Sequence, residues 1–175
     1  DTFDLCGGII CDDFNNDGYV DLISSTWDPN GQLKYFENDR QGGFVDKTEE
    51  SGLVGIFGGL NINQTDFNND GYLDIYVMRG GWLSVAGRMP NSLLRNNGDG
   101  TFCDISFACG IAGAGLDLPT QTSQWCDYDN DGDLDLFVGN EHDDSIMNAP
   151  SQLFRNNGDE SFENVAAEAG VENRR

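Results

Sequence analysis

Positively charged residues are scarce in this sequence. Its 175 residues include 9 lysines and arginines against 31 aspartates and glutamates, which gives a formal net charge of -22. Nucleic acid and anionic membrane surfaces are therefore not expected as partners, because binding to either needs a basic patch. The sequence has no run of about 18 apolar residues, so we expect no insertion into a membrane.

A disordered acidic tail is also excluded. Hydrophobic residues make up 38% of the chain and aromatic residues 11%, which is more than a disordered acidic segment carries. The length is sufficient for one domain with a buried core. The sequence therefore predicts a folded protein whose many carboxylates surround cations.

Histidine is nearly absent, and the cysteines lack the spacing of a zinc site. Cys103 with Cys109 and Cys6 with Cys11 are the candidates for local disulfides. The odd number of cysteines leaves at least one of them free or paired outside this segment. The only histidine is His142, and the five cysteines are Cys6, Cys11, Cys103, Cys109 and Cys126.

Motifs for catalysis are missing as well. The sequence contains no nucleophile elbow, no phosphate-binding G-x-x-x-x-G-K-[ST] loop and no paired-histidine motif. His142 stands beside Glu141, Asp143 and Asp144. It could belong to an acid/base cluster, but a lone histidine in a polar loop is more often a solvated surface residue. We therefore expect that the protein is not an enzyme.

What the sequence does have is a threefold repeat. An aspartate-rich stretch, called the Asp loop below, reads DFNNDGYVD at 13–21, DFNNDGYLD at 66–74 and DYDNDGDLD at 127–135. Each Asp loop is followed by a second motif in which a phenylalanine precedes a glycine by eight positions. Two motifs in the same order three times over establish an internal repeat. These pairs are Phe44 with Gly52, Phe102 with Gly110, and Phe162 with Gly170.

Each repeat is predicted to contain four strands. One strand precedes the Asp loop, an apolar strand follows it, and two more flank a turn such as NNGDG at 96–100. This order is a β-meander, the form of a propeller blade. The predicted fold class is all-β, with three four-stranded antiparallel blades at about 1–57, 58–116 and 117–175 in one propeller segment, 1–175. The stretch 163–170 could hold one helical turn.

The Asp loop has the chemistry of a site for a hard cation. In D-x-[DN]-x-D-G-x-x-D, alternate side chains converge on one point if the backbone curls, and the glycine permits that curl. All donors are oxygen and several are charged, which favours Ca²⁺. An EF-hand would need a glutamate at the twelfth loop position. That position is Ser24, Val77 and Val138 here, and a strand rather than a helix follows.

These residues resemble the FG-GAP or VCBS-type repeats of calcium-binding β-propellers, which occur in integrin α-subunit heads and in cartilage acidic protein-like chains with an ASPIC/UnbV region. The resemblance covers nearly the whole chain. The tripeptides that give the family its name are loose here, FGG at 57–59 and GAG at 113–115, and these 175 residues include no ASPIC/UnbV region. The resemblance implies one Ca²⁺ in each Asp loop, about three in all. The implied ligands are Asp13, Asn15, Asp17, Tyr19 (carbonyl) and Asp21; Asp66, Asn68, Asp70, Tyr72 (carbonyl) and Asp74; and Asp127, Asp129, Asp131, Asp133 (carbonyl) and Asp135.

Three blades do not close a propeller, which typically has about 4–8. We therefore expect further blades or self-association. The expected function is an extracellular or cell-surface module that binds proteins or glycans or mediates adhesion. The alternatives are a subunit of an extracellular filament and a part of a Ca²⁺-dependent polysaccharide-acting enzyme. Candidate contacts to a partner lie in the loops between second and third strands, and they are Trp27, Arg79, Trp82 and Arg88.

Overall fold

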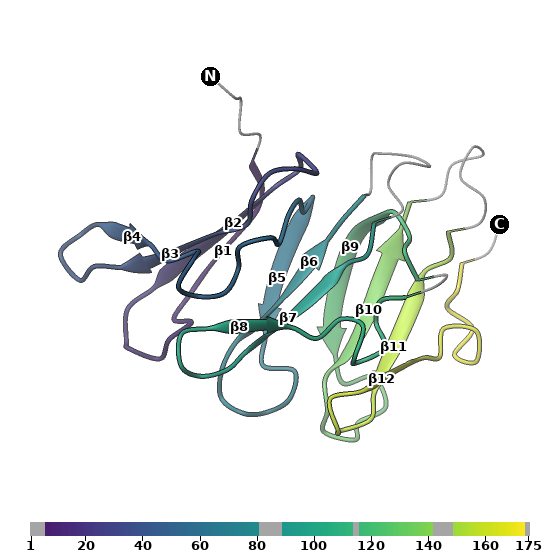
Figure 1. Cartoon of the computed structure of the whole chain (residues 1–175). Helices are drawn as coiled ribbons and strands as arrows, with labels where there is room; N and C mark the ends of the chain where they lie inside the picture. Colours follow the sequence, from purple (N-terminus) through teal and green to yellow (C-terminus); the bar gives the residue numbers. More distant parts are fainter. Residues whose placement is uncertain (1–5, 81–88, 114–115, 142–148, 174–175) are drawn as a thin grey trace.

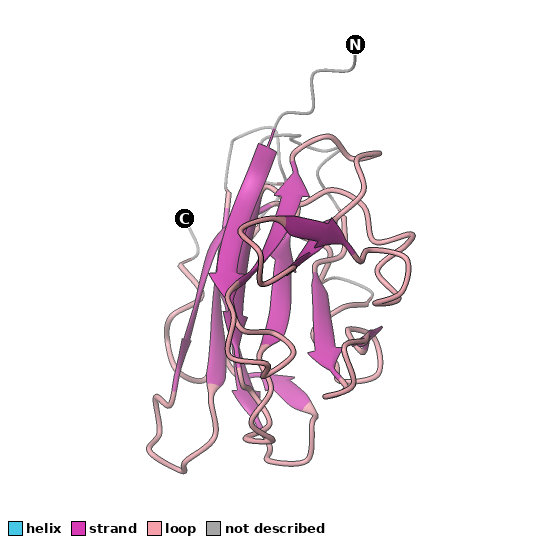
Figure 2. Ribbon diagram, turned by 90° about the vertical axis from the view of Figure 1, so that its left-hand side faces the viewer, coloured by secondary structure: helices cyan, strands magenta, loops and turns pink. Residues whose placement is uncertain are grey.

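The computed structural model describes residues 6–80, 89–113, 116–141 and 149–173, and within these ranges it contains strands and no helix (Figures 1 and 2). The strands begin and end close to the Asp loops and to the Asn-Gly turns that the sequence shows. Their bounds are β1 Cys6–Asp12, β2 Asp21–Thr26, β3 Lys34–Asn38, β4 Phe44–Asp46, β5 Asn61–Thr65, β6 Asp74–Met78, β7 Ser92–Asn96, β8 Phe102–Asp104, β9 Thr120–Cys126, β10 Asp135–Asn140, β11 Gln152–Asn156 and β12 Phe162–Asn164.

The strands form three four-stranded antiparallel sheets, each in chain order: β1 to β4, β5 to β8 and β9 to β12. We call these sheets blades 1, 2 and 3. They lie side by side, with β1 of blade 1 packed along β5 of blade 2, and β5 and β6 packed against β9 of blade 3 (Figure 1). The predicted all-β class with three four-stranded antiparallel blades is confirmed.

The hydrophobic core lies between the blades. One cluster joins Ile23 and Tyr35 of blade 1 to Ile75 and Phe102 of blade 2, and a second joins the other face of blade 2 to blade 3. The middle blade is therefore covered on both sides, and all five residues of its strand β6 are buried. Because a single blade buries one face only against its neighbour, the stacking of blades is what creates the core.

The stretch 163–170 holds a single turn, as the sequence allows, and no longer helix. It forms one hydrogen-bonded turn in which the backbone N of Ala169 donates to the carbonyl of Val165 at 2.9 Å. The equivalent bonds in blades 1 and 2 run from Ser51 to Lys47 and from Cys109 to Ile105, at 2.9 and 2.8 Å. This single turn is thus a regular part of each repeat.

The predicted disulfides are wrong, because all five cysteines are free. Cys6 and Cys11 both lie on β1, and five residues of extended strand span about 16 Å, far more than the separation of roughly 4.4–6.8 Å that a disulfide allows. Cys103 lies on the exposed side of β8, whereas Cys109 is buried in the core between blades 2 and 3. The two side chains of that pair belong to different environments.

Candidate metal centres

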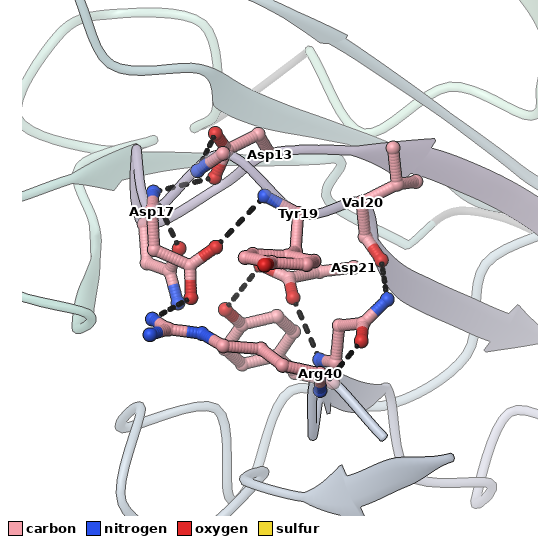
Figure 3. A network of polar contacts seen from close by, with 10 residues as sticks. Asp13, Asp17, Tyr19, Val20, Asp21 and Arg40 are labelled. Carbon is pink, nitrogen blue, oxygen red and sulfur yellow. Dashed lines mark hydrogen bonds and ion pairs between the residues drawn. The ribbon is translucent and has the colours of Figure 1, made fainter. Parts of the chain in front are cut away.

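The first Asp loop joins β1 to β2 and curls around the side chain of Asp13 (Figure 3). Asp13 Oδ1 accepts a hydrogen bond from the backbone N of Asp17 at 2.9 Å, and its Oδ2 accepts one from the backbone N of Gly18 at 2.7 Å. Asn16 and Gly18 have positive φ angles of 55° and 88°, in the region that asparagine and glycine tolerate. The glycine therefore permits the curl that the sequence predicts.

The same curl recurs in the other two loops. The fourth and sixth positions again have positive φ, as Asn69 and Gly71 in the second loop and Asn130 and Gly132 in the third. The first aspartate again accepts two backbone N–H groups through its two oxygens. Asp66 accepts from Asp70 and Gly71 at 3.0 and 2.9 Å, and Asp127 accepts from Asp131 and Gly132, both at 3.1 Å.

The middle positions of each loop also keep their side chains close to the loop backbone. At the third position, Asn15 and Asn68 accept from the backbone N of the residue two positions on, at 3.1 and 3.3 Å. The fifth position accepts in the same way from the seventh. Its pairs are Asp17 with Tyr19 at 2.9 Å, Asp70 with Tyr72 at 2.9 Å, and Asp131 with Asp133 at 3.0 Å.

The three loops lie next to one another along one edge of the molecule, the lower edge in Figure 1. The side-chain amide of Asn16 in the first loop donates to the carbonyl of Gly71 in the second at 3.0 Å. That of Asn69 in the second donates to Asp133 Oδ1 in the third at 3.3 Å. The fourth loop position therefore ties the first loop to the second and the second loop to the third.

The last aspartate of each loop is fully buried and connects the loop to the third strand of its own blade. Asp74 is 0% exposed; its Oδ1 accepts from the backbone N of Asn96 at 2.8 Å and its Oδ2 from that of Phe67 at 3.2 Å. Asp21 and Asp135 make the corresponding bonds to β3 and β11. Sequence reasoning missed this structural role, although an asparagine recurs at the end of each third strand.

These buried carboxylates lie in an unfavourable environment for a negative charge. Burial raises the pKa of Asp74 to about 7, and the charges of Asp70 and Asp66 add to the effect, although the two backbone amides oppose it. Burial likewise raises the pKa of Asp21 and of Asp135. A divalent cation in the loop would favour the charged form of each.

The third loop brings carboxylates together at a spacing that fits Ca²⁺. Asp127, Asp129 and Asp135 each offer an oxygen, and these oxygens lie within 4.8 Å of one another. Two ligands at about 2.3–2.6 Å from one Ca²⁺ are at most about 5 Å apart, so the separation of each pair of these oxygens is compatible with ligation of one ion. The first two loops have Asn15 and Asn68 where this loop has Asp129, and an amide oxygen is also a calcium ligand.

The first loop differs from the others because Arg40 reaches into it (Figure 3). The Arg40 guanidinium lies 2.6 Å from Asp17 Oδ2 and over the ring of Tyr19, 5.2 Å from its centre. The hydrogen bond from Arg40 holds the pKa of Asp17 below its usual value. Gly98 and Gly158 stand at the position of Arg40 in the other blades, and all three have positive φ. The contact of Arg40 with the loop was not predicted from the sequence, although Arg40 replaces the glycine found at this position in the other two repeats.

Arg40→Gly is expected to tighten calcium binding by the first loop, because it removes a positive charge from a candidate ligand. The glycine keeps the positive φ without strain. The gain in affinity should be roughly two- to fivefold, because the Arg40 side chain is exposed and an ion pair with an exposed partner is weak. Calorimetric calcium titration measures it, with Lys34→Gln as the control because Lys34 pairs with Asp46, outside the loop. Equal affinity in Arg40→Gly and wild type would contradict the assigned role of Arg40.

The residues predicted to contact partners differ in their exposure to solvent. Trp27 is 37% exposed, just beyond β2. Arg79 is buried at 7% exposure and donates to the carbonyls of Phe57 and Pro90 at 2.7 and 2.8 Å. Its predicted exposure is therefore wrong: the side chain holds two loops together. Trp82, Arg88 and His142 lie outside the described residues.

Comparison with known families agrees with this geometry. Residues 13–77 match the FG-GAP-like repeat, a span that begins at the first residue of the first Asp loop and ends in β6, just after the second Asp loop. A search of curated proteins finds no match to the chain. Among the described residues there is no helix with the length and hydrophobicity needed to cross a bilayer.

Proposed function

We propose, from the premise that this chain carries an FG-GAP-type repeat, that it is an extracellular propeller-blade module with a structural Ca²⁺ in each Asp loop. The observation that carries the proposal is the threefold recurrence of one curled loop with only oxygen donors. In each, the first aspartate holds two backbone amides and the last is buried. Plain solvated Asp-Gly turns would have no reason to bury the last carboxylate three times.

The proposed ion has a mechanical role. Each loop joins the first two strands of a blade, and its last aspartate is bonded to the third strand. An ion held by the first, third, fifth and last side chains would fix three strands relative to one another. Each Ca²⁺ would also offset two of the 22 excess negative charges. Loss of the ion would leave neighbouring carboxylates to repel one another.

Calcium titration by calorimetry tests the proposal. We expect wild-type protein, freed of metal, to bind Ca²⁺ in preference to Mg²⁺, because a flexible loop suits the larger ion. Asp127→Asn should lose the third site, since Asp127 is part of the carboxylate group there. Glu49→Gln, an exposed change outside the loops, is the matched control. Absence of calcium binding by the wild type would overturn the proposal.

The proposed binding of a partner uses the edge opposite the Asp loops. Trp27 follows β2 at the end remote from its loop, and with Cys6, Gly7 and Leu60 it lines a hollow of about 400 Å³. An exposed tryptophan beside a hollow is a typical anchor for a sugar or a protein. Trp27 and the hollow are therefore the reason to place the partner at this edge rather than elsewhere on the surface.

Trp27→Ala is expected to reduce binding to a glycan array at least tenfold if a sugar is the ligand, since it removes the aromatic face of the hollow. Phe107→Ala is the control, because Phe107 is 69% exposed and lies on another blade. Array binding that is equal in Trp27→Ala and wild type would remove this edge from the proposal.

A further inference from the structure

The two junctions between blades are built to one plan. Phe102, the first residue of β8 in blade 2, lies against Phe14 of blade 1, with ring centres 6.4 Å apart. Phe162, the first residue of β12 in blade 3, lies against Phe67 of blade 2 at 5.7 Å. These four rings are 0–7% exposed. At each junction, therefore, a phenylalanine of the later blade is buried against the Asp-loop phenylalanine of the earlier one.

Polar contacts repeat around these rings. The side-chain amide of Asn96 donates to the Phe14 carbonyl at 2.7 Å, and that of Asn156 donates to the Phe67 carbonyl at 3.0 Å. The backbone N of each later phenylalanine also donates to the earlier blade. Phe102 N bonds to the Ser51 carbonyl at 2.9 Å and Phe162 N to the Cys109 carbonyl at 2.7 Å.

Blade 1 carries the later half of such a junction on its outer face (Figure 2 views the molecule from this end). Phe44, the equivalent of Phe102 and Phe162, is 47% exposed, and Ile9 on β1 is 59% exposed. Leu22 and Phe36 face each other across β2 and β3 and are half-buried. The blade 2 equivalents of Ile9, Leu22 and Phe36 are Ile62, Ile75 and Leu94 in that order, and all three are buried at 4% exposure or less.

Blade 3 carries the earlier half of a junction on its own outer face. Tyr128, the equivalent of Phe14 and Phe67, is 39% exposed. Gly170 supplies a second sign. A Cβ on Gly52 or Gly110 would meet the carbonyl oxygen of the docked phenylalanine at 3.3 or 2.9 Å, whereas a Cβ on Gly170 would meet nothing within 4 Å.

We propose that the outer face of blade 1 docks on the outer face of blade 3 in a second copy of this chain. Phe44 packs against Tyr128 there, and the side-chain amide of Asn38 reaches the Tyr128 carbonyl as Asn96 reaches that of Phe14. A second copy fits because the chain holds both halves of one junction, on opposite ends. This head-to-tail contact is heterologous, so it builds a closed ring or an open filament.

The negative charge of the chain does not prevent two copies from meeting at the apolar outer face of blade 1. Lys34, which lies opposite Ser24 across β2 and β3, is paired with Asp46 at 3.0 Å. The Asp loops, which carry much of the acidity, gather at one edge, and calcium binding would lower their charge. Repulsion between copies is also screened over about 8 Å at physiological ionic strength.

Two variants with complementary defects test the proposal by sedimentation velocity in calcium. Phe44→Asp disables the blade 1 face only. Tyr128→Ser combined with Gly170→Asn disables the blade 3 face only, and asparagine tolerates the φ of 73° at that glycine. We expect wild type to associate with rising concentration, each variant to remain monomeric, and an equimolar mixture of the two to form a dimer through the one intact pair of faces.

Dimer formation in the mixture would also show that both variants are folded, because a misfolded variant could not complement its partner. Phe107→Asp, an exposed change on blade 2, should associate as the wild type does. Wild type that stays monomeric at the highest attainable concentration would overturn the proposal. So would association that survives in both variants, or a mixture that forms no dimer although each variant unfolds at the wild-type melting temperature. None of these outcomes depends on the number of calcium ions bound.

Discussion

Removal of calcium with EDTA is expected to lower the melting temperature of this protein by about 15–30 °C. Each ion that binds only the folded state adds about 2.7 kcal/mol at a hundredfold excess over its Kd, so three ions add about 8 kcal/mol. For a chain of this size, 1 kcal/mol corresponds to a shift of about 2–4 °C. The metal-free loops would also hold buried aspartates beside other carboxylates, as Asp74 is beside Asp70 and Asp66.

Differential scanning calorimetry measures this shift. Re-addition of Ca²⁺ in excess of the chelator should restore the original transition, whereas Mg²⁺ should restore much less of it, because Mg²⁺ demands tighter octahedral geometry. A melting curve that is the same with Ca²⁺ and with EDTA would show that the loops need no metal to hold the blades.

The second large effect separates the structural role of the last loop aspartate from its role as a ligand. Asp74→Ala is expected to destabilise even the metal-free protein by about 2–4 kcal/mol, because it leaves the buried amides of Phe67 and Asn96 without their acceptor. Asp70→Ala is the matched control: Asp70 is an implied ligand of the same loop but is exposed. In EDTA it should change stability by no more than about 0.5 kcal/mol.

Urea unfolding in EDTA and in Ca²⁺ measures both variants. In Ca²⁺, Asp70→Ala should lose the contribution of one site, about 2.7 kcal/mol at a hundredfold excess over Kd, and Asp74→Ala should lose this in addition to its metal-independent part. If Asp74→Ala and Asp70→Ala were equally stable in EDTA, the buried hydrogen bonds of Asp74 would not carry the role assigned to them.

Local pattern was enough to predict much of the fold. The Asp loops, the Asn-Gly turns and the alternation of apolar residues are contained within short windows, and each predicts its element by itself. The curl around Asp13 follows from its spacing to Gly18, five residues away. Threefold repetition then made the number of blades evident, since the same windows recur in the same order.

The features that the sequence did not predict depend on contacts between distant residues. Arg40 meets Asp17 only because the β3–β4 turn folds over the Asp loop. Arg79 is buried because its blade lies against the loop that contains Phe57. The exposure of Phe44 could not be predicted, because the residues around it in the sequence resemble those around Phe102 and Phe162. Only the structure shows that those two are buried between blades, whereas Phe44 lies on an outer face.

Calcium binding by the Asp loops is tested most directly by a crystal structure of the protein grown in Ca²⁺, with an anomalous difference map recorded at long wavelength. We expect three peaks, one inside each Asp loop, each ligated by the side chains at the first, third, fifth and last positions and by the carbonyl at the seventh. Loops without anomalous density at saturating Ca²⁺, or peaks held by other residues, would contradict this expectation.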